Sequence, residues 1–253
     1  MELSLWLMLF LLGAAFLAGF IDSIAGGGGL ISLPALLVAG VPPHYALGSG
    51  KLMSTFGTVI SLFLYARGKA VDWGVIAKGT AFALGGAFLG SETALHVDPD
   101  ILGRVIVFVL PVIAVIILSP RRTIHAPKAL SPLSSMTRIA LVCASIGFYD
   151  GFIGPGAGSF LLIGLHLFLG MGLVAASGTA KAFNLASNLG SLVAFFWSGK
   201  VLFAVGLPMA CANIAGNVLG SRLALKQGPE LVRKVLFVSL GMLLITLCLR
   251  YYG

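Results

Sequence analysis

The chain is built from apolar runs that are long enough to cross a lipid bilayer. A spanning helix needs about 20 apolar residues. Seven such runs lie at roughly 3–24, 45–66, 74–95, 101–118, 174–197, 202–225 and 230–250, and one more ends before residue 154. Of the 253 residues, 58% are hydrophobic and 9% are charged, whereas soluble proteins carry about 25% charged residues. The sequence therefore predicts an all-α polytopic membrane protein with a single membrane domain, 1–253.

Two glycine-rich stretches interrupt the apolar pattern. They read GFIDSIAGGGGL (19–30) and GFYDGFIGPGAGS (147–159), and each has an aspartate four residues before the glycine cluster. Because glycine costs about 1 kcal/mol relative to alanine inside a helix, we expect a helix to end at each cluster. The apolar pieces that follow, 30–40 and 159–170, are too short to cross a bilayer. They predict two glycine-broken half-helices.

The second half of the chain repeats the first. Asp22 and Asp150 are 150 − 22 = 128 residues apart; GFID matches GFYD, ALGSGK matches ASGTAK, and FLGSETAL matches VLGSRLAL. A unit of about 120 residues is too long for a solenoid repeat and is typical of the duplicated half of a transporter. We therefore divide the chain into repeat 1 (1–118), a linker (119–138) and repeat 2 (139–253).

Lysine and arginine residues in the loops predict the orientation. The linker 119–138 carries four of them, and cytoplasmic loops are enriched in these residues, so we place it in the cytoplasm and both termini outside. If each short piece turns back inside the membrane, the two repeats have inverted topology, with about eight transmembrane helices. The alternative is that the short pieces are tilted helices that cross completely.

Several functional classes are not expected from the sequence. The net charge of +8 arises mostly in short loops, as membrane orientation requires, so we expect no nucleic-acid partner. The three cysteines lie within apolar runs and the four histidines are scattered, so no metal site is predicted. GGGGLIS lacks the Lys-Ser/Thr ending of a phosphate loop, and no nucleophile–base pair is visible. We expect neither an enzyme nor a cofactor.

The two breaks and two lysines predict an anion site. A half-helix that begins after a glycine turn presents free N–H groups and a positive dipole end, which bind anions. The glycines expected to contact the anion are Gly28, Gly29, Gly156 and Gly158. Lys51 and Lys181 are repeat-equivalent and lie about two turns into apolar runs. A charge there costs at least ~2.5 kcal/mol and usually marks function, although snorkelling to the interface is the alternative.

Polar residues accompany the two lysines. Spacings of three and four residues put two asparagines on one helical stripe with Lys181. The further candidates for substrate binding are Thr55, Thr179, Asn184 and Asn188. These side chains either contact the substrate or pack one helix against another. Asp22 and Asp150 either offset the lysine charge, cap freed amides or carry a coupled proton.

Three stretches of the sequence carry a family resemblance. GFIDSIAGGGGLISLPALLVAGVPPHYALGSGKLMSTFGT (19–58), VDW (71–73) and GFYDGFIGPGAGSFL (147–161) resemble the TauE/SafE family of membrane proteins, also called sulfite exporters or the TSUP family. The resemblance runs over essentially the full chain. It implies transport of sulfite, sulfonates, sulfoacetate or related organosulfur anions across the bacterial inner membrane.

Together these observations lead us to expect a multi-pass secondary transporter of a small sulfur-containing anion. It would work by alternating access around an anion site near the midplane, with proton coupling as one option. The alternative is a channel-like anion pore. The expected partners are the anionic substrate and membrane lipid, and a homo-oligomer is left open.

Overall fold

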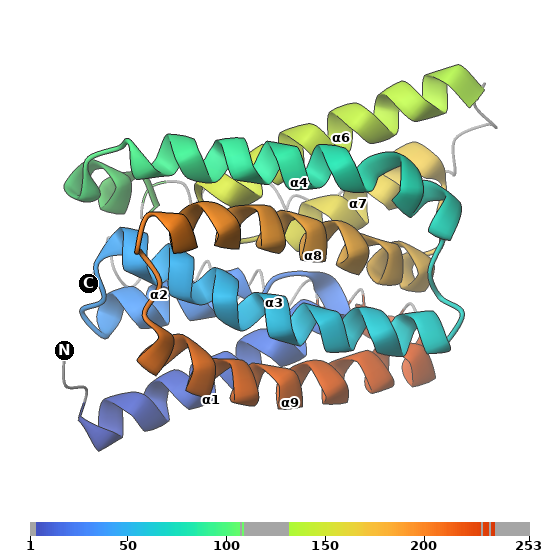
Figure 1. Ribbon diagram of the computed structural model, residues 1–253. Coiled ribbons are helices and arrows are strands. Elements are labelled where there is room, and N and C mark those ends of the chain that lie inside the picture. The colour runs from blue at the N-terminus through green and yellow to red at the C-terminus, as the bar shows by residue number, and fades with distance from the viewer. Residues whose placement is uncertain (1–3, 107, 109–131, 229, 233, 236–253) are drawn as a thin grey trace.

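The computed structural model describes residues 4–106, 108, 132–228, 230–232, 234 and 235, and these residues contain helices and loops but no strand. The helices are α1 (Leu5–Ala25), α2 (Gly29–Val38), α3 (Pro43–Arg67), α4 (Trp73–Leu95), α6 (Pro132–Phe152), α7 (Ala157–Leu169), α8 (Leu173–Trp197) and α9 (Phe203–Gln227). The long helices lie side by side in one bundle (Figure 1). The predicted all-α class is confirmed.

Helix length and composition fit a lipid environment. Within the described residues, α1, α3, α4 and α9 are long and apolar enough to cross a membrane, and α2 and α7 are shorter apolar helices. The helices α6 and α8 have 21 and 25 residues, which is also a spanning length. Most of the predicted runs at 101–118 and 230–250 lies outside the described residues.

One predicted boundary differs from the structure. The linker was expected over 119–138, of which 119–131 lies outside the described residues. Residues 132–138 belong to the first two turns of α6, which begins at Pro132. Proline suits the first position of a helix because its missing N–H would have no partner there. The polar composition of PLSSMTR therefore marks a helix end and not a loop.

The helix breaks lie where the glycines predict them. Helix α1 ends at Gly26, which has φ 78° and donates its N–H to the Asp22 carbonyl oxygen at 2.8 Å. Helix α7 begins directly after Gly156, which has φ 84°. Only glycine adopts this left-handed backbone readily. The chain can therefore turn sharply and begin a short helix within the bundle.

The two breaks touch each other at the centre of the bundle. The Ser159 N–H donates to the Gly26 carbonyl oxygen at 3.1 Å, and the Ser159 hydroxyl donates to the Ala25 carbonyl oxygen at 2.7 Å. A Cβ added at Gly26 would overlap the backbone of Gly158. Glycine is therefore required at this crossing, and the backbone polar groups of a broken helix find partners in protein, as they must inside a membrane.

Equivalent helices of the two halves run in opposite directions. Helix α1 starts at the end of the bundle where the N-terminus lies, whereas α6 starts at the other end; α3 and α8 show the same opposition (Figure 1). We call the end where α3 begins the α2–α3 end and the end where α8 begins the α7–α8 end.

Equivalent contacts occur at both ends. Near the α2–α3 end, the Ser49 hydroxyl accepts a hydrogen bond from the Leu202 N–H at 2.9 Å. Near the α7–α8 end, the Thr179 hydroxyl accepts one from the Asp72 N–H at 3.0 Å. Ser49 and Thr179 occupy the same position in the matching segments ALGSGK and ASGTAK. In each half, therefore, the start of a long helix binds a loop of the other half.

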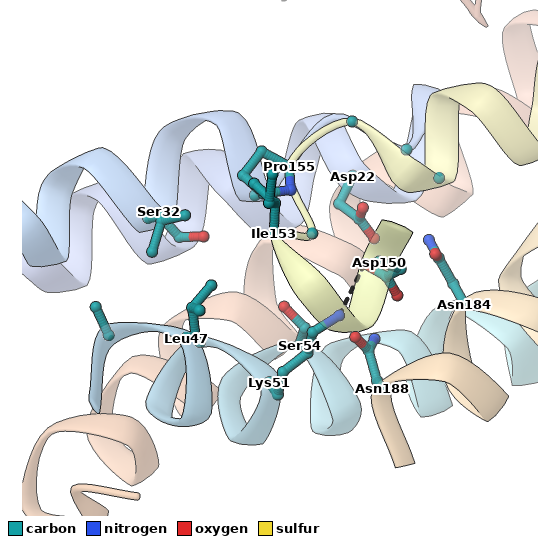
Figure 2. A pocket seen from close by; sticks show the side chains of 18 residues that line it. Asp22, Ser32, Leu47, Lys51, Ser54, Asp150, Ile153, Pro155, Asn184 and Asn188 are labelled. Atoms are coloured by element: carbon teal, nitrogen blue, oxygen red, sulfur yellow. Dashed lines mark ion pairs between the residues drawn. The ribbon is translucent and has the colours of Figure 1, made fainter. Parts of the chain in front are cut away.

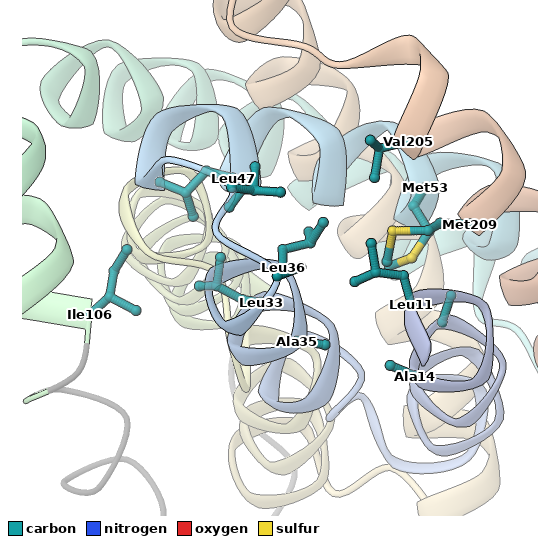
Figure 3. Packing of buried hydrophobic residues seen from close by; sticks show 14 of the residues in the cluster. Leu11, Ala14, Leu33, Ala35, Leu36, Leu47, Met53, Ile106, Val205 and Met209 are labelled. Carbon is teal, nitrogen blue, oxygen red and sulfur yellow. The ribbon is translucent and has the colours of Figure 1, made fainter. Parts of the chain in front are cut away.

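The described residues form two buried apolar clusters. The first joins α1, α2, α3 and α9 and includes Leu11, Leu36, Met53 and Met209 (Figure 3). The second includes Ile24, Tyr65, Leu161 and Phe183. Because lipid is as apolar as these side chains, close packing rather than water exclusion holds such helices together. Residues of the first cluster, including Leu33 and Leu47, also line the candidate site.

Candidate functional site

A cavity of about 60 Å³ lies where the two breaks meet (Figure 2). This volume can hold several water molecules. Its polar side chains come from α1, α2, α3, α6 and α8 and are Asp22, Ser32, Lys51, Ser54, Asp150, Asn184 and Asn188. Its glycines are Gly26, Gly29, Gly50, Gly154, Gly156 and Gly158. The cavity is therefore lined by both repeats and by both broken segments.

An ion pair across the two repeats borders this cavity. The Lys51 ammonium lies 2.7 Å from Asp150 Oδ1, and the two side chains are 7% and 6% exposed. Asp150 Oδ2 accepts a hydrogen bond from the Ser187 hydroxyl on α8. Both charged groups are thus buried, partnered and in contact with the cavity.

A second ion pair joins the other lysine to the other aspartate. The Lys181 ammonium lies 2.8 Å from Asp22 Oδ2 and also donates to the Asp22 carbonyl oxygen at the end of α1. The Lys181 side chain is 1% exposed, and Lys181 is not among the described residues that line the cavity. Its ammonium therefore has two acceptors and no access to the cavity, in contrast to Lys51.

The predicted polar residues fall into two groups. Asn184 and Asn188 line the cavity; Asn188 donates to Thr58 at 3.4 Å, whereas the Asn184 side chain makes no hydrogen bond to a described residue. Thr55 and Thr179 lie outside the lining. The Thr55 hydroxyl donates to the Lys51 carbonyl oxygen at 2.8 Å. The structure gives these two threonines backbone partners instead of a place at the cavity.

The predicted glycines also divide. Gly29, Gly156 and Gly158 line the cavity, whereas Gly28 does not and faces the side chain of Asp22. The N–H groups of Gly29 and Gly158, at the starts of α2 and α7, have no hydrogen-bond partner among the described residues. Both residues, at the starts of opposite half-helices, line the same cavity.

Sequence reasoning missed two features of this site. The first is that each lysine pairs with the aspartate of the other repeat, which only the packing of the two halves decides. The second is Ser187, whose hydroxyl holds Asp150. Its position three residues after Asn184, on the same helical stripe, is the signal that indicates it.

Comparison with known proteins decides the family. The profile of the sulfite exporter TauE/SafE family matches residues 11–247. The chain belongs to the TauE/SafE family. The resemblance inferred from the glycine motifs is thus confirmed, and the TauE/SafE profile includes both breaks and both lysines.

Individual TauE/SafE relatives agree with this assignment. A Sinorhizobium protein named probable membrane transporter protein ORF9 is 38% identical over 240 residues, which cover 94% of this chain and 90% of that protein. The Escherichia coli K12 protein named probable membrane transporter protein YfcA is 36% identical over 233 residues, covering 88% and 83%. A Haemophilus influenzae probable membrane transporter protein is 34% identical, covering 94% and 93%. No solved structure matches the chain.

Proposed function

We propose that this protein is a secondary transporter of a small sulfur-containing anion in the bacterial inner membrane. The observation that carries the proposal is Lys51, a buried ammonium that lines a central cavity between two helix breaks. The family description names sulfite export, and the relatives are named probable membrane transporters. Sulfite, sulfonates and sulfoacetate are the substrate class that this description favours.

The groups around the cavity suit a compact oxyanion. The ammonium of Lys51, the free amides of Gly29 and Gly158 and the amide group of Asn184 are all hydrogen-bond donors, and all border one small space. An anion with several oxygens can accept from several of these donors at once. A cavity of about 60 Å³ favours a small charged head over a long apolar chain.

The two ends of the cavity support alternating access rather than a pore. The lining includes Ala46 and Leu47 in the first turn of α3, but among the described residues of α8 it begins only at Asn184. Fully buried Tyr65 and Phe183 lie in the apolar cluster toward the α7–α8 end. A channel-like pore needs a continuous path, which this cluster interrupts. We infer a state that faces the α2–α3 end.

We also propose that the repeats are inverted and that the α2–α3 end is extracytoplasmic. The opposed directions of α1 and α6 and the equivalent contacts of Ser49 and Thr179 support this. In a variant without native cysteines, a membrane-impermeant thiol reagent applied to intact cells should label Ser198→Cys and spare Lys69→Cys. The reverse pattern would overturn the orientation.

Binding to the purified protein tests the site. We expect sulfite, thiosulfate, sulfoacetate or ethanesulfonate to raise the unfolding temperature. Lys51→Gln keeps most of the side-chain volume and removes the charge, so it should weaken anion binding tenfold or more, which is about 1.4 kcal/mol. The matched control is Lys69→Gln, because Lys69 is an exposed loop lysine. Equal affinities of parent and Lys51→Gln would reject the site.

Transport measurements separate a carrier from a pore. In proteoliposomes, a carrier should show a saturable rate and counterflow, in which unlabelled anion on one side accelerates uptake of labelled anion on the other. A channel-like pore shows neither. If none of the anions that bind the protein shows counterflow, the pore would be favoured.

A further inference from the structure

We infer that the anion binds together with a proton, and that Asp150 is the residue that takes this proton. The inference rests on the proposed transport of an anion through the cavity. It goes further because it assigns different roles to the two aspartates and specifies what must accompany the anion.

The first step is the charge of the empty site. Two lysines and two aspartates form two ion pairs, so their formal charges cancel. Among the described residues that line the cavity, these pairs supply every charged group. An anion that entered alone would leave one uncompensated negative charge beside two buried ion pairs, which is costly.

The second step is that the anion must use Lys51. Lys51 lines the cavity, whereas Lys181 does not and its ammonium already has two acceptors on Asp22. When an anion binds the Lys51 ammonium, it shares that single positive charge with Asp150 Oδ1, which lies 2.7 Å from the ammonium. Asp150 then faces a second negative charge at its only cation, while Asp22 keeps Lys181 to itself.

The third step compares what remains around each carboxylate. After the anion has bound, Asp150 shares Lys51 with it, and its other hydrogen-bond partner is the neutral hydroxyl of Ser187. The neighbouring groups from α8, Asn184 and Asn188, are uncharged, and the Tyr149 hydroxyl on α6 donates to the Pro155 carbonyl oxygen. Asp22 on α1 faces the same cavity but stays ion-paired. A carboxylate that shares one cation with a bound anion is stabilised by protonation, because the two negative charges repel each other.

The fourth step is access to the pair. Gly154 has φ 92°, and a Cβ added there would lie 3.5 Å from Asp150 Oδ1 and 3.7 Å from Lys51 Nζ. The missing side chain leaves this side of the pair next to the cavity. Both a proton and an anion can therefore reach the atoms that must separate.

The exchange is balanced in charge and in protons. The Lys51 ammonium moves from the Asp150 carboxylate to the anion, and one proton from solvent bonds to Asp150 Oδ1. For a singly charged anion the site is neutral before and after. Net transport of the anion is then coupled to one proton moving in the same direction, so a pH gradient can drive it.

The test counts protons during binding to the purified full-length protein. The probe is ethanesulfonate, which does not titrate near neutral pH, measured by titration calorimetry in buffers of different ionisation enthalpy. The parent should take up about one proton per anion, and its affinity should fall with rising pH by up to tenfold per unit. Asp150→Asn should bind ethanesulfonate with no proton uptake and little pH dependence.

The matched control is Asp22→Asn, which should retain proton uptake wherever it folds. The parent measurement needs no variant, so the inference stays testable if a variant fails to fold. Ethanesulfonate binding without proton uptake in the parent would overturn the inference and leave the proposed function standing. Equal proton uptake in Asp150→Asn and parent would also overturn it. If neither ethanesulfonate nor the other anions bind the parent, the proposed function fails and the inference with it.

Discussion

The residues toward the two ends of the cavity differ in their chemistry. Toward the α7–α8 end, the Tyr65 hydroxyl donates to the Ser23 carbonyl oxygen at 2.9 Å and lies 3.3 Å from the Ser177 hydroxyl. Ser177 in turn donates to the Ile24 carbonyl oxygen at 2.9 Å. We call these four residues the Tyr65 latch. It ties α3 and α8 to the last residues of α1.

The equivalent positions toward the α2–α3 end are apolar. In the alignment of the repeats, Ser177 corresponds to Leu47 and Tyr65 to Phe195. Leu47 lines the cavity, and Phe195 is fully buried. Neither side chain can form the hydrogen bonds of the Tyr65 latch. A net hydrogen bond contributes about 1 kcal/mol, so we expect the α7–α8 end to be the harder one to open.

The comparison separates a contact that occurs at both ends from hydrogen bonds that occur at only one end. Ser49 and Thr179 bind loops of the opposite repeat in the same way at both ends, and this contact holds the helices in place. The positions of the Tyr65 latch, in contrast, hold hydroxyl side chains at one end and apolar side chains at the other. We therefore expect a resting preference for the state that faces the α2–α3 end.

The largest expected effect comes from the two ion pairs beside the cavity. Lys181→Gln leaves the largely buried Asp22 carboxylate without its cation, and breaking a buried pair costs about 3–5 kcal/mol. Lys51→Gln leaves Asp150 with the Ser187 hydroxyl as a hydrogen-bond donor, so its loss of stability should be smaller. Thermal unfolding of both purified variants, without anion, measures the difference. Equal unfolding temperatures would remove the distinction between the two pairs.

A smaller effect is expected from Tyr65→Phe. This change removes the latch hydroxyl and nothing else, so it should favour opening of the α7–α8 end by about 1 kcal/mol, or roughly fivefold. The measurement is the rate at which a thiol reagent modifies Ala180→Cys, because Ala180 is buried beside the latch. The equivalent position at the other end is already a phenylalanine, so the matched control there is Phe195→Leu, which removes an aromatic ring. An unchanged labelling rate in Tyr65→Phe would show that the latch does not hold this end closed.

The smallest effect is expected from Ser177→Ala. It removes the hydrogen bond to Ile24 but leaves Tyr65 bound to Ser23. Labelling of Ala180→Cys should therefore rise less than in Tyr65→Phe. Because the two hydroxyls are in contact, the double variant should deviate from the sum of the single effects. Strict additivity would mean that the two hydroxyls act independently.

Local chemistry made much of this structure predictable. The glycine clusters predicted that one helix stops at Gly26 and that another begins at Ala157, because backbone conformation at these points depends on only a few residues. The predicted cavity residues Lys51, Asn184 and Asn188 followed from spacing along single helices. Transport, the inverted repeats and the assignment of the substrate site stay predictions.

Contacts between distant segments could not be predicted in this way. Lys181 meets Asp22 across 159 positions, and Thr179 meets Asp72 in a loop of the other repeat. Such pairs depend on how whole helices pack, and periodicity carries no information about that.

The backbone contact between the breaks has a mechanical consequence. Ser159 fastens the start of α7 to the last carbonyl groups of α1, at Ala25 and Gly26, and no side chain separates Gly26 from Gly158. Such a joint permits rotation but resists separation. We therefore expect it to act as a fulcrum: the repeats tilt about it, the two ends of the cavity exchange, and the bound anion stays at one depth in the membrane.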